Sequence, residues 1–410
     1  MNLELVTGCP LRQISAPSFE PYLAKTLSEA VAAPWYRRAG MKPGSPLASL
    51  PILDRSMVAE HTDELLTGAV PAPLRRKLST GGSTGAPVVV WLDRSISLSE
   101  WRFMTRQWST VGYRRGSWRI VLRGRLLKGG SIGPEIDRLR REVRLSTFHL
   151  TSETLPDYLR AMSDYPGAFL HAYPSSASRL AEACEQSGRQ LPRFQAVLLG
   201  SEGSSPAQRD ALAAAYGCPV YSWYGQTEKV LLGGECAASR EYHLFPGYGY
   251  AEIVDDAGDP VTEPGRLGRL IGTGFLNHCA PLVRYDTGDL AAFATGECPC
   301  GWKGQRLRSV VGRTQDYVLT PAGTQATIAA LNLHDHLYEG LRQIQYVQRE
   351  RRDLVLVRIV VASHWTGDAT QALQSALSDR LPGCTVTVEP VESVEIAANG
   401  KAPLVIRTVE

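Results

Sequence analysis

Apolar and polar positions follow two different repeats along the first half of the chain. Short apolar runs rich in valine, isoleucine and leucine are typical of buried strands, whereas apolar residues spaced three and four apart are typical of helices. The runs that predict strands are 88–91, 119–122, 195–199 and 219–223, and the segments that predict helices are 94–112, 134–144, 175–187 and 206–216. Strands that alternate with helices predict a parallel or mixed sheet with helices on its faces. Ligands bind such sheets beyond the carboxyl ends of the strands.

The rest of the chain has a different pattern. Residues 15–70 read as helices interrupted by prolines, and 244–316 read as short strands joined by turns. Beyond Asp316 the pattern predicts a separate unit, with strands at 341–348, 353–361 and 384–391 and a helix at 368–380. A chain of 410 residues is too long for one core. We therefore expect an α/β fold with a large domain at 1–316, whose mixed sheets carry flanking helices and a β-rich subdomain, and a small α+β domain at 317–410.

The composition narrows the class of protein. Hydrophobic residues make up 43% and charged residues 21% of the chain, which is ordinary for a globular protein. The net charge of +3 comes without a long lysine or arginine run, so nothing points to nucleic acid. No apolar run reaches the about 18 residues of a transmembrane helix, and the N-terminus lacks a signal-peptide pattern. We therefore expect no membrane partner and a cytoplasmic location, where cysteines serve as thiols or metal ligands.

A loop of glycine and hydroxyl residues, STGGSTGAP at 79–87, is the first candidate for chemistry. Glycine lets the backbone approach a ligand closely and turn its N–H groups inward, and serine and threonine hydroxyls add donors, so such a loop can hold phosphates. The loop lacks the lysine of the Walker pattern, which argues against a P-loop NTPase. On its own, the same composition also fits an ordinary surface turn.

Four later motifs stand in a defined order behind this loop. They are YGQTE at 224–228, RYDTGD at 284–289, GRTQD at 312–316 and NGKAP at 399–403. Together with the loop, their order and spacing resemble the adenylate-forming superfamily of acyl-CoA synthetases, adenylation domains and luciferases. The short phenylacetate-CoA ligase-like and CapK-like branch is nearest in pattern. The resemblance covers most of the chain, from residue 79 to residue 403.

This resemblance implies that ATP, with magnesium, activates a carboxylic acid to an acyl-adenylate, releasing pyrophosphate, and that the acyl group then passes to coenzyme A. Two alternatives stay open. In the first, the acyl group goes to an amine, a hydroxyl or a carrier-protein thiol, as in ligases of secondary metabolism. In the second, the chain binds nucleotide without catalysis, although intact Glu228, Asp289 and Lys401 argue against that. The oligomeric state, including a homodimer, is left open.

The nucleotide site implied by the resemblance draws on all of these motifs. The glycine loop would hold the β- and γ-phosphates, the loop at 200–203 would pack along adenine with Tyr224 on the ring face, and Asp289 with Arg313 would bind the ribose. The nucleotide-binding positions are Thr80, Gly82, Ser83, Thr84, Gly85, Gly200, Ser201, Glu202, Gly203, Tyr224, Gly225, Asp289 and Arg313. Ala86 replaces the lysine that the family usually has, so phosphate binding would depend more on backbone N–H groups.

Three residues would carry the catalysis. Glu228 would bind magnesium, a cation that prefers hard carboxylate oxygens, and Thr227 would contact the α-phosphate. Lys401 would bridge the carboxylate and the α-phosphate, because its ammonium is a compact charge on a flexible stem. In the family the C-terminal domain is a mobile lid that brings this lysine in, and Asp316 stands where its hinge lies.

The acyl pocket of relatives matches segments on both sides of the 200–203 loop. The candidate pocket residues are His171, Tyr173, Ser175, Trp223 and Leu231. Aromatic walls suit a flat acid, which makes an aromatic carboxylate the favoured substrate. The alternative is that these aromatic side chains belong to the core.

Cysteine and histidine residues predict a metal site. Cys298 and Cys300 form a tight pair, and Cys236 and His243 lie upstream. Three thiolates and one imidazole suit tetrahedral zinc, and four protein ligands leave no open position, so the zinc would be structural. Part of the resembling branch has similar positions. The alternative is a set of free thiols and a surface histidine.

Overall fold

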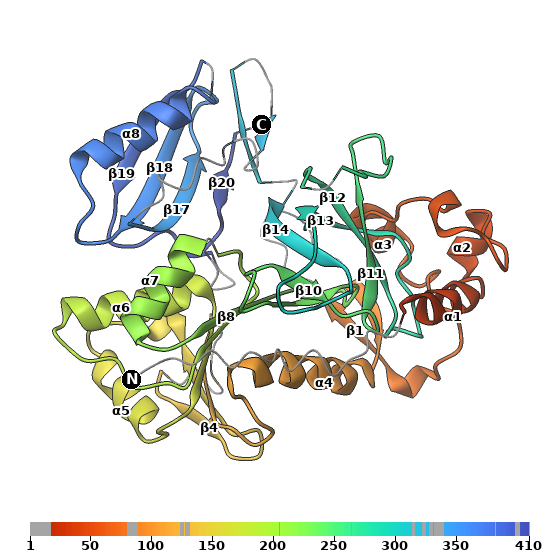
Figure 1. The fold of residues 1–410 in the computed structure, drawn as a ribbon, viewed down its shortest axis with the longest axis horizontal. Coiled ribbons are helices and arrows are strands. Elements are labelled where there is room, and N and C mark those ends of the chain that lie inside the picture. The colour runs from red at the N-terminus through yellow and green to blue at the C-terminus, as the bar shows by residue number, and fades with distance from the viewer. Residues whose placement is uncertain are drawn as a thin grey trace. The chain divides into compact units, whose positions relative to one another are not determined.

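The computed structural model describes residues 18–79, 89–123, 127, 132–204, 206–263, 265–313, 316–321, 325–327, 331, 340–381, 383–397 and 402–409. Contacts among residues divide the chain into two compact units. The first unit comprises residues 1–112 and 222–311, and the second comprises 113–221 and 312–410. Both units combine sheets with helices (Figure 1), which confirms the predicted α/β class. The predicted domain boundary at residue 316 stays a prediction.

The first unit begins with the helices α1 (Glu20–Ala30), α2 (Pro34–Arg38) and α3 (Arg55–Glu60), as the proline-interrupted pattern predicted. Asp54 is the N-cap of α3, and its carboxylate accepts a hydrogen bond from the Met57 N–H at 2.8 Å. The antiparallel strands β1 (Arg75–Ser79) and β2 (Val89–Asp93) precede α4 (Ile96–Trp108). The later strands are β8 (Val220–Gly225), β9 (Leu232–Glu235), β10 (Tyr242–Leu244), β11 (Gly249–Val254), β12 (Gly268–Gly274), β13 (Tyr285–Phe293) and β14 (Arg306–Arg313).

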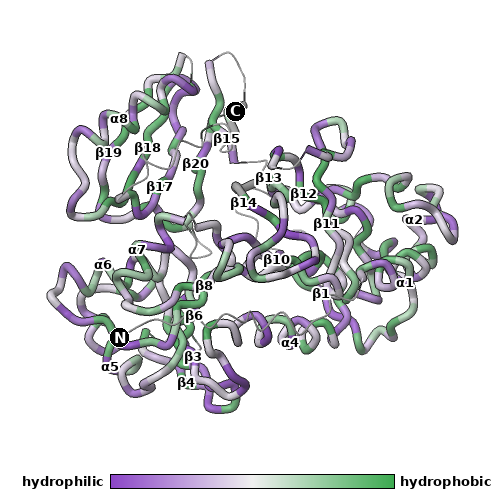
Figure 2. The backbone as a smooth tube through the Cα atoms, viewed as in Figure 1, coloured by the Kyte–Doolittle hydropathy of each residue, from purple (hydrophilic) through white to green (hydrophobic). Residues whose placement is uncertain are grey.

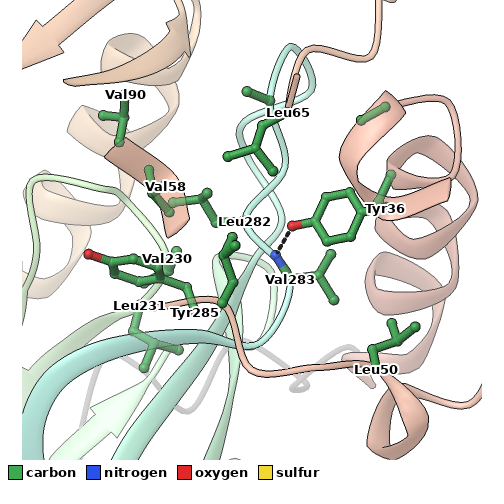
Figure 3. Close-up of a cluster of buried hydrophobic side chains, with 14 of the residues drawn as sticks. Tyr36, Leu50, Val58, Leu65, Val90, Val230, Leu231, Leu282, Val283 and Tyr285 are labelled. Carbon is green, nitrogen blue, oxygen red and sulfur yellow. Dashed lines mark hydrogen bonds between the residues drawn. The ribbon is translucent and has the colours of Figure 1, made fainter. Parts of the chain in front are cut away.

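These later strands lie in the order β11-β12-β13-β14-β10-β9-β8. The core beside them gathers Leu65, Leu282 and Tyr285 with apolar side chains of the N-terminal helices (Figure 3). The buried Tyr36 hydroxyl donates to Pro281 O at 2.9 Å and accepts from Val283 N at 2.8 Å. Because a buried hydroxyl without partners destabilises a fold, these two bonds fix α2 against the segment that leads into β13.

The second unit contains a mostly parallel sheet in the order β7-β6-β3-β5-β4. Its strands β7, β6, β3 and β5 run parallel, and β4 pairs antiparallel at the edge. The elements are β3 (Arg119–Arg123), β4 (Glu135–Asp137), β5 (Glu142–Ser146), α5 (Leu155–Ser163), β6 (Phe169–Ala172), α6 (Pro174–Gln186), β7 (Val197–Leu199) and α7 (Pro206–Tyr216). Every residue of β6 and β7 is buried, and for β7 the apolar run at 195–199 predicted this. None of the helices in the described ranges is long and apolar enough to span a membrane.

The C-terminal part of the second unit is the predicted α+β arrangement. Its four-stranded sheet has the order β19-β18-β17-β20, and α8 packs against β19 (Figure 1). Figure 2 shows β18 as largely hydrophobic, and it lies between β17 and β19 with alternate residues buried over most of its length. The elements are β15 (Tyr317–Leu319), β16 (Gln325–Thr327), β17 (Leu341–Gln348), β18 (Leu354–Val361), α8 (Gly367–Ser378), β19 (Thr385–Pro390) and β20 (Val405–Arg407).

The helix expected over 134–144 is wrong, because this segment forms β4 and β5. Charged residues hold the two strands together. Arg144, whose side chain is 6% exposed, pairs with Glu135 at 2.9 Å and Asp137 at 2.8 Å. The charge pattern suited a solvated helix face, yet cross-strand pairing lets both carboxylates reach one buried guanidinium. A buried charge of this kind needs partners, and the strand arrangement supplies them.

Candidate functional site

The motifs at 224–228 and 284–289 lie side by side in the first unit, and each donates a hydrogen bond to the other. Tyr224, at the end of β8, donates its hydroxyl to Asp289 Oδ2 on β13 at 2.6 Å. In return Tyr285, at the start of β13, donates to Glu228 Oε1 in the loop behind β8 at 3.0 Å. Each motif therefore contributes one phenol and one carboxylate, and each phenol holds the carboxylate of the other motif. Sequence reasoning named three of these four residues and missed Tyr285, although it lies inside the RYDTGD motif.

The electrostatics of the first pair keep it in one protonation state. Burial, and then the adjacent Asp289, hold the pKa of the Tyr224 phenol well above its ordinary value. The phenol therefore remains a hydrogen-bond donor throughout the neutral range. Gln226 fixes it further, because Gln226 Nε2 donates to the Tyr224 hydroxyl at 2.5 Å and Gln226 Oε1 accepts from the Leu231 N–H at 3.1 Å. The loop behind β8 is thus tied to the strand that it follows.

Glu228 is 6% exposed, which is unusual for a loop carboxylate. Within the described part of the chain its hydrogen-bond partner is Tyr285, which contacts only Oε1. Its neighbour Lys229 has a positive φ of 62° and points its ammonium to Glu100 Oε1 at 2.8 Å, not to Glu228. A buried carboxylate with one neutral partner is suited to bind a hard cation such as Mg²⁺ through the other oxygen.

The remaining site residues of the first unit lie close to these pairs in sequence. Gly225 ends β8, and Thr227 is half-buried in the turn behind it. Trp223 on β8 packs edge-on against Trp108 of α4, with ring centroids 5.4 Å apart. Leu231 is 1% exposed and lies within the core cluster. Whether Trp223 and Leu231 also contact an acid stays a prediction.

In the second unit, two predicted pocket residues gather at the carboxyl ends of parallel strands. His171 on β6 accepts a hydrogen bond at Nε2 from Arg123 Nη2, at the end of β3, at 2.5 Å. The Arg123 guanidinium also lies 5.3 Å from the centre of the Tyr173 ring. Burial, followed by Arg123 and Arg119, lowers the pKa of His171 well below its ordinary value, so the imidazole is neutral. Sequence reasoning did not place Arg123 in the acyl pocket, although a charged residue that ends an apolar run was the available signal.

Ser175 and Glu202 form a second contact in this unit. Ser175, in the first turn of α6, donates its backbone N–H to Glu202 Oε2 at 3.1 Å and its hydroxyl to Glu202 Oε1 at 3.0 Å. The Ala402 N–H donates to the same Oε1 at 3.0 Å. Glu202 lies with Gly200, Ser201 and Gly203 in the loop after β7, where Ser201 has a positive φ of 70°.

Several predicted residues fall outside the described part of the chain. Arg313 ends β14, but its side chain is not among those described, and the half-buried Asp316 directly precedes β15. The others are Thr80, Gly82, Ser83, Thr84, Gly85 and Lys401. Their roles stay predictions.

The predicted zinc ligands of the first unit converge on one point. The ligand atoms of Cys236, His243, Cys298 and Cys300 all lie within 4.8 Å of one another. The Sγ atoms of Cys236 and Cys298 are 3.7 Å apart, those of Cys298 and Cys300 are 3.4 Å apart, and His243 Nε2 lies 3.3 Å from Cys298 Sγ. A tetrahedral ion with Zn–S bonds of about 2.3 Å would separate two sulfurs by about 3.8 Å. The spacing of these ligand atoms is thus close to that of a tetrahedral zinc site.

The chemistry of these four side chains agrees with their geometry. Burial, with Arg306 nearby, lowers the pKa of His243 to about 4, so its imidazole is neutral at pH 7, as a metal ligand must be. Trp302 stacks on this ring with centroids 4.9 Å apart and fixes its plane. Cys236 follows β9, His243 lies on β10, and both other cysteines lie between β13 and β14. A bound ion would therefore join segments that are distant in sequence.

A separate cavity of about 230 Å³ in the second unit involves α6, β17 and β18 but none of the predicted pocket residues. Glu182 of α6 lines it and is 8% exposed, and its Oε1 has no hydrogen-bond partner among the described residues. Arg342 of β17 lines the same cavity and pairs with Glu185 at 3.2 Å. Burial raises the pKa of Glu182 to about 7, an effect that Arg342 opposes and Glu185 reinforces.

This raised pKa makes stability depend on pH in a defined direction. Because the folded carboxyl has a pKa of about 7 against 4.5 ordinarily, the folded state holds the proton more tightly. Ionising Glu182 therefore destabilises the fold by up to about 3 kcal/mol above pH 7, and this penalty vanishes below pH 4.5. Glu182→Gln should raise the free energy of unfolding at pH 8 and leave it nearly unchanged at pH 4, as measured by urea unfolding. Asp157→Asn, at a side chain 63% exposed on α5, is the control and should change little at either pH.

Comparison with known proteins places these features in context. No protein-family model matches the chain. The phenylacetate-coenzyme A ligase of Thermus thermophilus is 25% identical over 318 residues, which cover 75% of this chain and 70% of that protein. A crystal structure of 2-hydroxyisobutyryl-CoA ligase in the postadenylation state has a TM-score of 0.72 at 20% identity and covers 99% of this chain and 94% of its own. The acyl acid amido synthetase AtGH3.15 has a TM-score of 0.63 at 12% identity, with 98% and 92% covered.

Proposed function

We propose that the chain is an AMP-forming ligase of the adenylate-forming superfamily, which activates a carboxylic acid with ATP, because its motif order, its sequence match and its fold agree with that superfamily. A carboxylate oxygen attacks the α-phosphorus, and the bond to the β-phosphate breaks to release pyrophosphate. The thiol of coenzyme A then attacks the acyl carbon and expels AMP. Two of the similar proteins are coenzyme A ligases by name, which supports this acceptor.

One observation carries the proposal: the reciprocal pairing of the motifs at 224–228 and 284–289. Each motif supplies one carboxylate, and a phenol from the other motif fixes it. Glu228 would hold Mg²⁺, and the ion would supply positive charge against the phosphates. Asp289 accepts hydrogen bonds from the ribose diol with two oxygens, for which a carboxylate is well suited. A shared site for both groups explains why residues some 60 positions apart are held by direct hydrogen bonds.

The remaining roles follow the motif pattern. Thr227 contacts the α-phosphate, and the loop at 80–85 holds the outer phosphates. Lys401 supplies the positive charge that lets two anions approach. The acid lies near His171 and Tyr173, and their rings favour an aromatic acid. Arg123, which donates a hydrogen bond to His171, lines the same acyl pocket.

The four-residue cluster of Cys236, His243, Cys298 and Cys300 holds a structural zinc ion in this proposal, because its distances suit a tetrahedral ion. With four protein ligands the ion would take no part in the reaction. It would fasten the β9–β10 segment to the loop between β13 and β14. A cytoplasmic location, a homodimer and a place in secondary metabolism remain predictions.

A pyrophosphate-release assay over a panel of carboxylic acids tests the function. We expect release that depends on an aromatic acid, with AMP and an acyl thioester formed when coenzyme A is present. The fold shared with an acyl acid amido synthetase is the reason to include amines as second acceptors. Amide formation with an amine and no thioester would favour the amine-acceptor alternative. Absence of release with every acid would leave a nucleotide-binding protein without this catalysis.

A further inference from the structure

The carboxylate of Glu202 joins two parts of the second unit that are far apart in sequence. On one side it accepts the N–H and the hydroxyl of Ser175 at the N-terminus of α6, and on the other it accepts the N–H of Ala402. Ala402 is bonded directly to Lys401, the proposed catalytic lysine, through the peptide unit whose N–H Glu202 accepts. Neighbouring Cα atoms lie about 3.8 Å apart, so a fixed Ala402 restricts where the lysine begins.

The α6 side of this contact is rigid. Pro174 begins the helix and has no N–H, and Tyr173 provides no side-chain cap, so the free N–H of Ser175 needs an acceptor from elsewhere. Glu202 supplies that acceptor, and its negative charge is favoured at the positive end of the helix dipole. Because the N–H and the hydroxyl of Ser175 both donate to Glu202, its carboxylate has a defined position that does not depend on Ala402. It is therefore a preformed docking point and not a flexible surface side chain.

The C-terminal side is rigid as well. Gln345 of β17 is fully buried, and its side-chain Nε2 donates to Glu395 O and to Pro403 O, each at 2.9 Å. Its Oε1 accepts the Glu395 N–H at 3.0 Å. One side chain thus holds both Glu395 and Pro403. Pro403 is therefore held by Gln345, and Ala402, the residue before it, is held by Glu202.

From these contacts we propose that Glu202 is a positioning residue for the first half-reaction: it docks the Ala402 amide and so places Lys401 where its charge assists the attack of the acid carboxylate on ATP. This role rests on the proposed function and differs from the adenine contact expected for the 200–203 loop. A nucleotide contact would act on ATP affinity, whereas a docking contact acts on the rate of adenylation. Transfer of the acyl group from a preformed adenylate does not use Lys401 in this scheme, so it should not depend on Glu202.

The test compares Glu202→Ala, Glu202→Gln and the wild-type chain in the two half-reactions. Misplacing a catalytic group by about 1 Å can lower a rate about 100-fold, so we expect Glu202→Ala to lower the kcat of acid-dependent pyrophosphate release about 10- to 100-fold. The KM for ATP and the rate of thioester formation from synthetic acyl-adenylate should change less than about twofold. Glu202→Gln keeps one acceptor oxygen, so its kcat for pyrophosphate release should lie between those of the wild type and Glu202→Ala. Glu185→Gln, on the helix α6 that Glu202 contacts, is the matched control and should behave as the wild type.

Hydrogen exchange provides a readout that needs no activity. The peptide that contains Ala402 should exchange its amide faster in Glu202→Ala than in the wild type, and Glu185→Gln should not change it. A raised KM for ATP with unchanged kcat, an equal loss in both half-reactions, or unchanged exchange at Ala402 would each overturn the proposed role. If the wild-type chain released no pyrophosphate with any acid, the proposed function would fail. Exchange at Ala402 would then still decide whether Glu202 docks this segment.

Discussion

Replacing Lys401 by alanine is expected to lower the rate of acyl-adenylate formation by about 10²- to 10³-fold. Removing one group that stabilises charge in a transition state has an effect of this size. The loss should be large here, because Ala86 replaces the lysine that relatives carry in the glycine loop, so the chain has one cation fewer to draw the carboxylate toward the phosphate. Pyrophosphate release with a saturating acid measures this half-reaction. Lys401→Arg keeps the charge but not the compact ammonium, so it should recover only part of the rate.

The second half-reaction is the internal control for this variant. Thioester formation from a synthetic acyl-adenylate contains no attack on ATP, so Lys401→Ala should carry it out at nearly the wild-type rate. Lys303, whose side chain is 66% exposed and pairs with Glu297, offers a control on the surface, and Lys303→Ala should leave both half-reactions unchanged. The assignment of Lys401 is wrong if both half-reactions fall together or if neither falls.

Loss of the metal cluster is expected to have the largest effect on stability. Cys298→Ser removes the ligand that lies nearest to the other three, at 3.7 Å from Cys236, 3.4 Å from Cys300 and 3.3 Å from His243. Loss of a structural metal belongs to the class of changes that destabilise a protein by more than about 4 kcal/mol. For a compact unit of this size such a loss corresponds to a melting temperature lower by about 10 °C. Elemental analysis should find one zinc per wild-type chain and little in the variant.

Cys384→Ser is the matched control, because this thiol is half-buried and lies outside the cluster. Its sulfur contacts only backbone carbonyls among the described residues, Arg352 O at 3.6 Å and Leu319 O at 3.9 Å, and a serine hydroxyl can also donate there. Its melting temperature should stay close to that of the wild type, with a full complement of zinc. Wild-type protein without zinc, or equal melting temperatures for Cys298→Ser and Cys384→Ser, would contradict a structural metal site.

Local pattern was sufficient for most of the elements. The apolar runs at 119–122 and 195–199 became β3 and β7, because a run of branched apolar residues is stable only where both faces are buried. The helices α6 and α7 and the C-terminal strands also lie where the periodicity placed them. The helix predicted over 134–144 is wrong for a physical reason. Its charged residues pair across two strands, and the spacing of residues within one segment does not reveal a partner strand.

The sequence by itself determined the motifs, their order and the chemistry that their residue types allow, because these properties belong to short stretches of chain. Only the tertiary structure decided which side chains meet. The exchange of partners between Tyr224 and Asp289 and between Tyr285 and Glu228, and the docking of Ala402 on Glu202, each join residues that are 57 to 200 positions apart. A hydrogen bond forms only when its donor and acceptor lie about 3 Å apart. For residues this far apart in sequence, that distance is set by the order of the strands and the packing of the backbone.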